Sequence, residues 1–178
     1  VTEAKQHSKQ GRYTDALSIY ANLYAKGELQ LNDKKSWGWD LYKFNKEELQ
    51  KGTEDKIPPA SAQIVKRNLN TYLKLELKEP DLLHSLLLRQ ALQLAKEDHL
   101  QVLPFFRLWG PHQFRDEDFK SETGKDGKSY PSLAERTLKI ASSNAIESNK
   151  KSDVKFILPH LTSTLDLHPQ NIWLKLAF

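Results

Sequence analysis

The chain contains no cysteine and no methionine among its 178 residues. Without cysteine it can form no disulfide, no iron–sulfur cluster, no zinc site with thiolate ligands and no thiol nucleophile. Without methionine it lacks an initiator. We therefore expect either that the initiator was removed or that the chain is a piece of a longer protein.

Long hydrophobic runs are missing as well. No stretch approaches the roughly 18 apolar residues of a membrane-spanning helix, and residues 1–20 have no continuous apolar core like that of a signal peptide. With a hydrophobic fraction of 38%, the composition predicts a soluble cytoplasmic protein that does not enter a membrane.

The charge is only mildly basic. There are 27 Lys and Arg residues against 23 Asp and Glu residues, a net charge of +4. The excess is spread almost evenly along the chain, and its closest approach to a patch is three doublets, Lys34-Lys35, Lys66-Arg67 and Lys150-Lys151. Scattered charge is typical of a solvated surface, but the doublets leave nucleic-acid binding open as a second interpretation.

Helical periodicity dominates the apolar pattern, and no alternating strand pattern or Asn-Gly hairpin turn is present. The clearest stripe is followed by Gly27, which we expect to end its helix. A second helix carries Trp37, Leu41 and Phe44, with Asn32 or Asp33 as its N-cap. The first stripe consists of Ala16, Ile19, Tyr20, Leu23 and Tyr24.

The remaining elements follow from prolines, glycines and caps. Pro58-Pro59 opens a helix, Ser132 with Glu135 forms a capping box, and Pro159 should kink the helix that begins near Ser152. We therefore expect helices over residues 60–78, 81–97 and 104–109, a turn at 110–114, a polar loop over 115–131, and helices from 132 to the end.

The first 27 residues resemble a tetratricopeptide repeat (TPR), which pairs two antiparallel helices through small residues and a Gly-x-Tyr turn. A second, partial match covers about residues 152–178, where Pro169 is similar to the closing proline of one repeat and Trp173-x-x-Leu176-Ala177 to the opening of the next. The N-terminal match consists of Ala4, Gly11-Arg12-Tyr13, Ala16, Tyr20 and Leu23.

This resemblance implies an all-α fold in which antiparallel helix pairs build a TPR-like right-handed α-solenoid. We expect one domain over residues 1–178. The apolar end of the chain suggests that it continues as a longer protein, of which this is the N-terminal part. The domain divides into a TPR-like pair (1–31), an irregular helical middle with Trp-rich and Leu-rich helices (32–114), a polar loop (115–131) and TPR-like helices (132–178).

The motifs tested for chemistry all fail. Residues 121–129 end like a phosphate-binding loop, but Glu122 stands where a glycine is required. The acidic residues of the loop lack the spacing of a calcium site. The six histidines are scattered, and His84 on the leucine-rich helix is typical of a hydrogen-bonded core histidine. The sequence predicts no catalytic residue, no cofactor and no metal site.

The leading hypothesis is a non-enzymatic interaction or scaffold module that binds a peptide or partner helix in a helical-repeat groove. The alternative is a nucleic-acid-associated accessory domain with a diffuse basic surface, and an enzyme ranks third. The TPR resemblance implies basic and amide residues on the N-terminal helix pair, and the two tryptophans join them if they are exposed. The candidate partner-binding residues are Lys5, Lys9, Arg12, Asn22, Trp37 and Trp39.

Overall fold

A computed structural model describes most of the chain, and the described part is mainly helical. The described residues are 1–52, 56–77, 82–98, 102–109, 114, 116–124 and 127–167. The chain divides into two compact units, Val1–His99 and Leu100–Phe178. The boundary falls inside the segment expected as an irregular middle, and each unit is described by itself.

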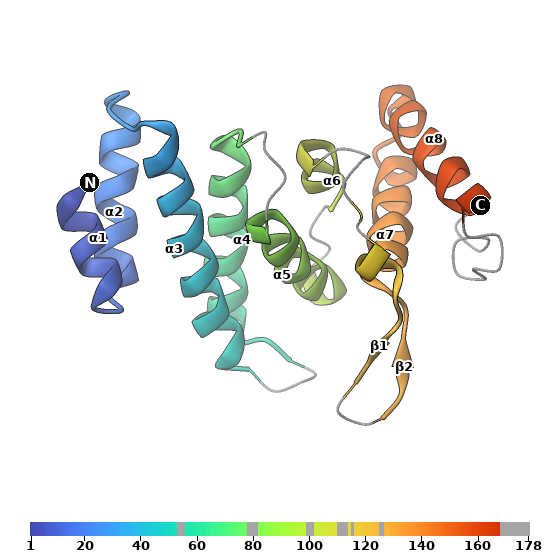
Figure 1. Ribbon diagram of the computed structural model, residues 1–178, viewed down its shortest axis with the longest axis horizontal. Helices are drawn as coiled ribbons and strands as arrows, with labels where there is room; N and C mark the ends of the chain where they lie inside the picture. The colour runs from blue at the N-terminus through green and yellow to red at the C-terminus, as the bar shows by residue number, and fades with distance from the viewer. Residues whose placement is uncertain are drawn as a thin grey trace. The chain divides into compact units, whose positions relative to one another are not determined.

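Unit 1 contains five α-helices in which each helix packs on the next (Figure 1). The third helix also packs on the fifth. Apolar residues with no exposed surface hold the centre of this unit, among them Leu69, Leu83 and Leu87. The helices are α1 (Thr2–Lys9), α2 (Tyr13–Ala25), α3 (Leu31–Gln50), α4 (Pro59–Lys74) and α5 (Leu82–Asp98).

Two glycines end the first two helices, Gly27 at the predicted stop and Gly11 at the turn that the repeat resemblance implies. Gly11 and Gly27 adopt φ angles of +71° and +72°, which a residue without a Cβ reaches at little cost. After α2, the Gly27 N–H donates to Tyr24 O at 3.0 Å and the Glu28 N–H to Leu23 O at 2.9 Å. This pair of bonds is the Schellman motif, and it satisfies carbonyls that the helix end would leave unpaired.

The start of α3 corrects the predicted cap. The helix begins at Leu31, and its N-cap is Gln30, which makes no side-chain capping bond. Asn32 and Asp33 therefore lie inside the first turn, where the Asp33 carboxylate accepts a hydrogen bond from Lys5 Nζ at 3.2 Å. A contact with α1 thus replaces the expected local cap.

The boundaries of α4 and α5 agree in part with expectation. Pro59 is the first residue of α4, and α5 closely matches the predicted helix 81–97. However, α4 ends at Lys74 rather than at residue 78, and the backbone turns at Glu76 with a φ of +49°. Pro80, which was expected to end this helix, lies outside the described residues.

Unit 2 contains three α-helices, a short 3₁₀ helix and a hairpin among its described residues. The predicted polar loop 115–131 is wrong in detail, because it contains two antiparallel strands paired in the register Glu122↔Tyr130 and Thr123↔Ser129. Strands of two residues are too short to show an alternating pattern. The elements are α6 (Leu103–Trp109), η1 (Asp116–Phe119), β1 (Glu122–Thr123), β2 (Ser129–Tyr130), α7 (Leu133–Glu147) and α8 (Lys151–Leu167).

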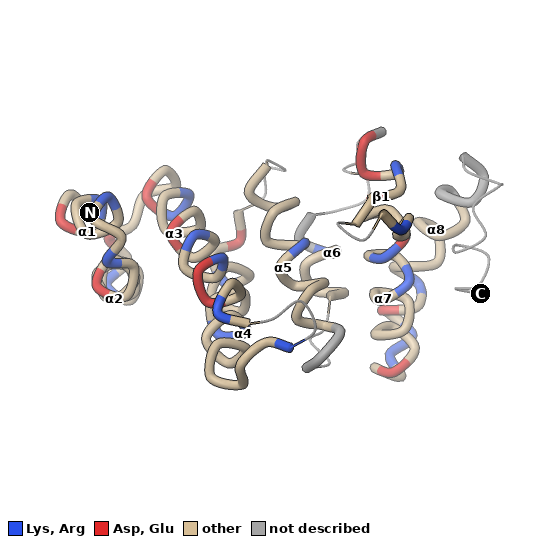
Figure 2. Tube along the Cα trace, turned by 90° about the horizontal axis from the view of Figure 1, so that it is seen from below, with Lys and Arg blue, Asp and Glu red and all other residues tan. Residues whose placement is uncertain are grey.

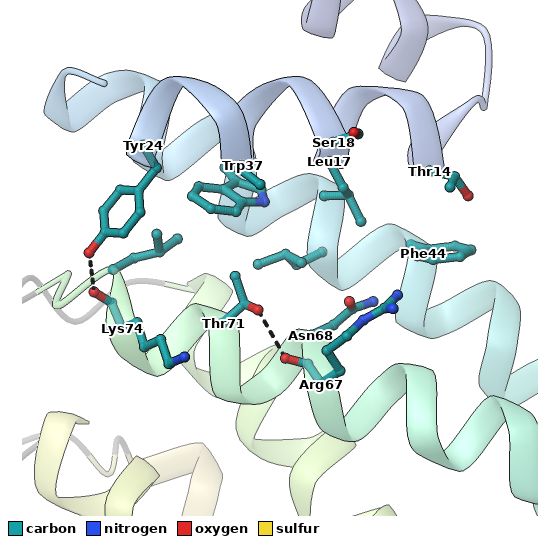
Figure 3. A pocket seen from close by; sticks show the side chains of 13 residues that line it. Thr14, Leu17, Ser18, Tyr24, Trp37, Phe44, Arg67, Asn68, Thr71 and Lys74 are labelled. Carbon is teal, nitrogen blue, oxygen red and sulfur yellow. Dashed lines mark hydrogen bonds between the residues drawn. The ribbon is translucent and has the colours of Figure 1, made fainter. Parts of the chain in front are cut away.

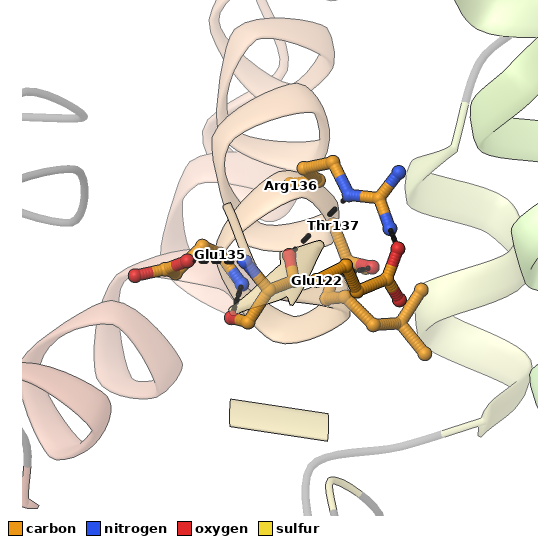
Figure 4. Close-up of polar contacts among 6 residues, drawn as sticks. Glu122, Glu135, Arg136 and Thr137 are labelled. Atoms are coloured by element: carbon orange, nitrogen blue, oxygen red, sulfur yellow. Dashed lines mark hydrogen bonds and ion pairs between the residues drawn. The ribbon is translucent and has the colours of Figure 1, made fainter. Parts of the chain in front are cut away.

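The predicted capping box at the start of α7 is confirmed. The Glu135 N–H donates to Ser132 Oγ at 3.2 Å, while the Ser132 N–H donates to the Glu135 carboxylate (Figure 4). Arg136 Nη2 bonds Glu122 Oε2 at 2.7 Å and ties the hairpin to this helix. The last helix, α8, continues through Pro159 to Leu167, and the predicted repeat opening at 172–178 lies outside the described residues.

Candidate functional site

Unit 1 carries a groove bordered by α2, α3 and α4, which we call the α2–α4 groove (Figure 3). Its volume is about 480 Å³, which is in the range of pockets that hold small ligands or single side chains. Apolar side chains form much of its wall, including Leu17 of α2, Leu41 of α3 and Leu75 at the end of α4. Such a surface favours an apolar group from a partner.

Trp37 lies in the wall of the groove and is only 4% exposed. Its ring stacks on Tyr20, with centroids 6.0 Å apart, and meets the Tyr24 ring edge-on at 5.6 Å. These aromatic contacts hold the indole in one orientation. The indole Nε1–H is buried and makes no hydrogen bond within the described residues, and in Figure 3 it lies on the ring edge that faces Leu17.

The rim of the groove on α4 is cationic. Arg67 and Lys74 line it and are exposed, and within the described part of the chain neither side-chain cation has a hydrogen bond or ion pair. They are seven positions apart, which places them two turns and about 10.5 Å from each other along the helix. No acidic residue is found among the described residues that line the groove.

The charge pattern sets α4 apart from its neighbours. Along α3, which packs on α4, basic and acidic positions are interspersed (Figure 2). Helix α4 contains Lys66, Arg67 and Lys74 but no Asp or Glu. A shallower hollow of about 360 Å³ continues along these three cations on the outer face of α4. The surface beside the groove therefore favours anionic groups.

One end of the groove is bridged by Tyr24. Its hydroxyl donates to the Lys74 carbonyl at 3.1 Å, so that α2 and α4 are joined directly. The ring is 38% exposed, and Lys34 Nζ lies 5.4 Å from its centroid. The bridge fixes the spacing of the two helices that form the sides of the groove.

A chain of buried amides, which we call the amide ladder, crosses unit 1 and ends at the groove. Asn68 Nδ2 donates to Asn45 Oδ1 at 2.9 Å, and Asn45 Nδ2 donates to Gln90 Oε1 at 3.1 Å. Gln90 Nε2 then donates to the Tyr42 carbonyl at 3.1 Å. Because a backbone carbonyl can only accept, it sets the direction of every amide in the chain. Asn68, the last member, lines the groove, and its Oδ1 has no partner among the described residues.

The opposite side of α3 holds a buried carboxyl group. Burial raises the pKa of Asp40, against the effects of a hydrogen bond from Ser8 Oγ at 2.5 Å and of Lys43. Burial, followed by the nearby carboxylates of Asp40 and Asp33, raises the pKa of Tyr20 to about 12. These groups lie where α1 and α2 meet α3.

The structure brings only one of the sequence-predicted partner residues into the groove, and that residue is Trp37. Trp37 was a candidate on the condition that it is exposed, and the structure shows it buried. Lys5 is paired with Asp33, and Arg12 lies beside Gln10 and Asp15. Trp39 is half-buried against Tyr42, with ring centroids 5.9 Å apart. Lys9 and Asn22 are exposed on α1 and α2.

Sequence reasoning missed Arg67, Lys74 and Asn68. A signal for the two cations was present, because residues 59–74 contain three basic residues and no acidic one. Asn68 gave no signal, since its role depends on α3 and α5. The prediction for His84 as a core histidine is confirmed, because it is buried with a ring nitrogen 2.8 Å from the Tyr72 hydroxyl.

No three metal-ligating side chains lie close enough together to hold a metal ion in the described ranges. Of the helices that could be searched there, none combines the length and the hydropathy needed to cross a membrane. Comparisons with protein-family models, curated proteins and solved structures found no match. We therefore argue the function from the geometry and chemistry of the groove.

Proposed function

We propose that this chain is a non-enzymatic protein-interaction module whose α2–α4 groove binds an acidic polypeptide segment. The segment inserts one apolar side chain between α2 and α4 and places carboxylates against Arg67 and Lys74. The observation that carries the proposal is the combination of an apolar groove with two cations that have no partner in the described part of the chain. An acidic partner supplies the missing counter-charges, while a basic one is repelled.

We also propose that unit 1 is a TPR-like right-handed helical array. Support comes from the sequential packing of α1 to α4 and from the contact of α3 with α5. The small residues Ala4 and Ala16 have no exposed surface, as the close approach of paired helices requires. On this arrangement the groove lies on the side of the array that the second helices, α2 and α4, line.

The groove is too small for a tight complex by itself. Burying a Leu or Phe side chain contributes about 1.5–3 kcal/mol, and each exposed ion pair at the rim adds roughly 0.2–1 kcal/mol. These contributions sum to about 2–5 kcal/mol and must also offset the entropic cost of association, so a short peptide is expected to bind with a dissociation constant no tighter than roughly a millimolar. Such affinities are typical of transient contacts that gain strength from a larger interface.

The test uses the full chain and two capped tetrapeptides, acetyl-Glu-Phe-Ala-Glu-amide and acetyl-Lys-Phe-Ala-Lys-amide. Binding is followed by NMR through the methyl signals of Leu17 and Leu41. We expect the acidic peptide to bind at least fivefold more tightly, and the double variant Arg67→Glu with Lys74→Glu to reverse this preference. Lys9→Glu, a matched change on the exposed face of α1, should alter neither affinity by more than twofold. Equal binding of both peptides would refute the charge argument.

The cations of α4 also motivate the second candidate, a nucleic-acid-associated domain. A single-stranded 20-nucleotide DNA or RNA titrated at increasing salt separates the two. Contacts with phosphates give a steep linear fall of log K with log salt. Binding that vanishes in Arg67→Glu with Lys74→Glu and exceeds the affinity for the acidic peptide would favour the nucleic acid.

A further inference from the structure

We propose that the α2–α4 groove recognises the backbone of an extended segment, with Asn68 Oδ1 accepting from a partner N–H and Trp37 Nε1–H donating to a partner C=O. This inference rests on the proposed function and specifies it further. It selects an extended chain over a helix and assigns Asn68 and Trp37 as the residues that fix its position. The amide ladder is the device that orients Asn68.

The acceptor is set by the ladder. The Tyr42 carbonyl accepts a hydrogen bond from the Gln90 amide nitrogen. Gln90 Oε1 accepts from the Asn45 amide nitrogen, and Asn45 Oδ1 accepts from the Asn68 amide nitrogen. Rotating any one of these amides by 180° would place two donors or two acceptors against each other. Asn68 must therefore direct its nitrogen into the ladder, which leaves Oδ1 as the group available to the groove that it lines.

The donor is Trp37. Its Nε1–H is buried without a partner, which is uncommon because an unpaired buried donor costs about 1–3 kcal/mol. A partner carbonyl reaches this nitrogen through a rotamer change in the groove wall, of the kind that interfaces commonly undergo on binding. When the partner carbonyl accepts from this donor, the free-energy cost of the unpaired N–H is removed in the complex.

A donor from α3 and an acceptor from α4 that line the same groove match an extended chain, in which each peptide unit offers a free N–H and a free C=O. Inside a helix those groups are already paired with each other. The α2 side of the groove, from Thr14 to Tyr24, is about 15 Å long, which accommodates about four extended residues. Arg67 and Lys74, about 10.5 Å apart, then face carboxylates three residues apart on that segment.

The test follows the indole N–H signals of the ¹⁵N-labelled full chain, with that of Trp37 assigned through Trp37→Phe. The probes are acetyl-Glu-Phe-Ala-Glu-amide and its analogues carrying an N-methyl group at one amide in turn. We expect the Trp37 indole signal to move downfield on binding. We also expect at least one N-methyl analogue to bind five- to tenfold more weakly. In Asn68→Ala the penalty of that N-methyl group should disappear, as a double-mutant cycle requires when the two groups interact.

The outcomes separate the two proposals. If the Leu17 and Leu41 methyl signals shift while the indole signal stays fixed and every N-methyl analogue binds equally, backbone recognition is refuted and the groove remains a binding site. If no groove signal moves, the proposed function fails as well. The wild-type measurements decide the question even if Asn68→Ala does not fold. Tighter binding of a side-chain-stapled helical peptide with the same charges would also overturn the inference.

Discussion

Replacing Asn45 by leucine should destabilise unit 1 far more than the change in volume suggests. Asn45 is 0% exposed and forms the centre of the amide ladder. It donates to Gln90 Oε1 and accepts from Asn68 Nδ2. In Asn45→Leu both of these buried partners lose their hydrogen bond. Each unpaired group costs about 1–3 kcal/mol, so we expect a loss of about 2–6 kcal/mol in the free energy of unfolding.

The same reasoning predicts that further substitutions restore stability. When Asn68→Leu and Gln90→Leu are added to Asn45→Leu, no side-chain amide of the ladder remains, and only the Tyr42 carbonyl loses its partner. The triple variant should therefore be at least 1 kcal/mol more stable than the single variant, because replacing all partners of a hydrogen-bond chain costs less than removing one. Asn70→Leu, on the exposed side of α4, is the matched control and should change stability by less than about 0.5 kcal/mol.

The assay is urea unfolding of the full chain, with far-ultraviolet circular dichroism measured together with tryptophan fluorescence. Trp37 and Trp39 report on unit 1 when Trp109 and Trp173 of unit 2 are replaced by phenylalanine, and an unchanged m-value shows that a midpoint shift reflects stability. A single variant that loses less than 0.5 kcal/mol, or a triple variant less stable than the single one, would show that the ladder does not act as a connected network.

Three further predictions concern other parts of the molecule. The free energy of unfolding of Tyr20→Phe should lie within about 1 kcal/mol of wild type at pH 8, since the buried Tyr20 hydroxyl interacts only weakly, with Ser36. The pKa of Tyr20 is raised in the folded state to about 12, so the folded wild type loses stability as the pH rises from 10 to 12. In urea titrations its free energy of unfolding should fall by about 2 kcal/mol relative to that of the variant over this range. Ser132→Ala removes the capping box of α7 and should cost about 1–2 kcal/mol in thermal unfolding; Ser143→Ala, exposed on the same helix, should cost less than 0.5 kcal/mol. The combined variant Lys5→Ala, Lys9→Ala and Arg12→Ala should leave binding of acetyl-Glu-Phe-Ala-Glu-amide within twofold; a larger loss by NMR titration would place the partner on α1 instead of in the groove.

Features that are decided by residues close together in the sequence could be predicted from it. The stops at Gly11 and Gly27 and the capping box of Ser132 with Glu135 are decided within a few residues, and the structure has all of them. The start of α3 could not be predicted from the local sequence, because Asp33 pairs with Lys5 of α1 instead of capping its own helix. The hairpin of unit 2 has strands too short to leave a periodic signal.

The candidate site was only partly predictable for the same reason. Trp37 stood out by its residue type, but its burial and its unpaired nitrogen depend on Tyr20 and Tyr24 of another helix. Arg67 appears in the sequence as half of a basic doublet, whereas its relevant companion is Lys74, two turns later on the same rim. The ladder joins residues from three helices, and no local pattern relates them.

The groove combines several features that stability alone does not favour. Among the described residues of unit 1, the unpaired Trp37 donor lies in the groove, whereas the unpaired Tyr20 hydroxyl and His7 Nδ1 lie outside it. The groove is also lined by Asn68 and by two cations without counter-charges. A helical array that served only to fold would gain stability from a carboxylate near Arg67. Residues that do not favour the stability of the fold are commonly found at functional sites. The features of this groove fit the partner that we propose, an extended acidic chain with an apolar side chain.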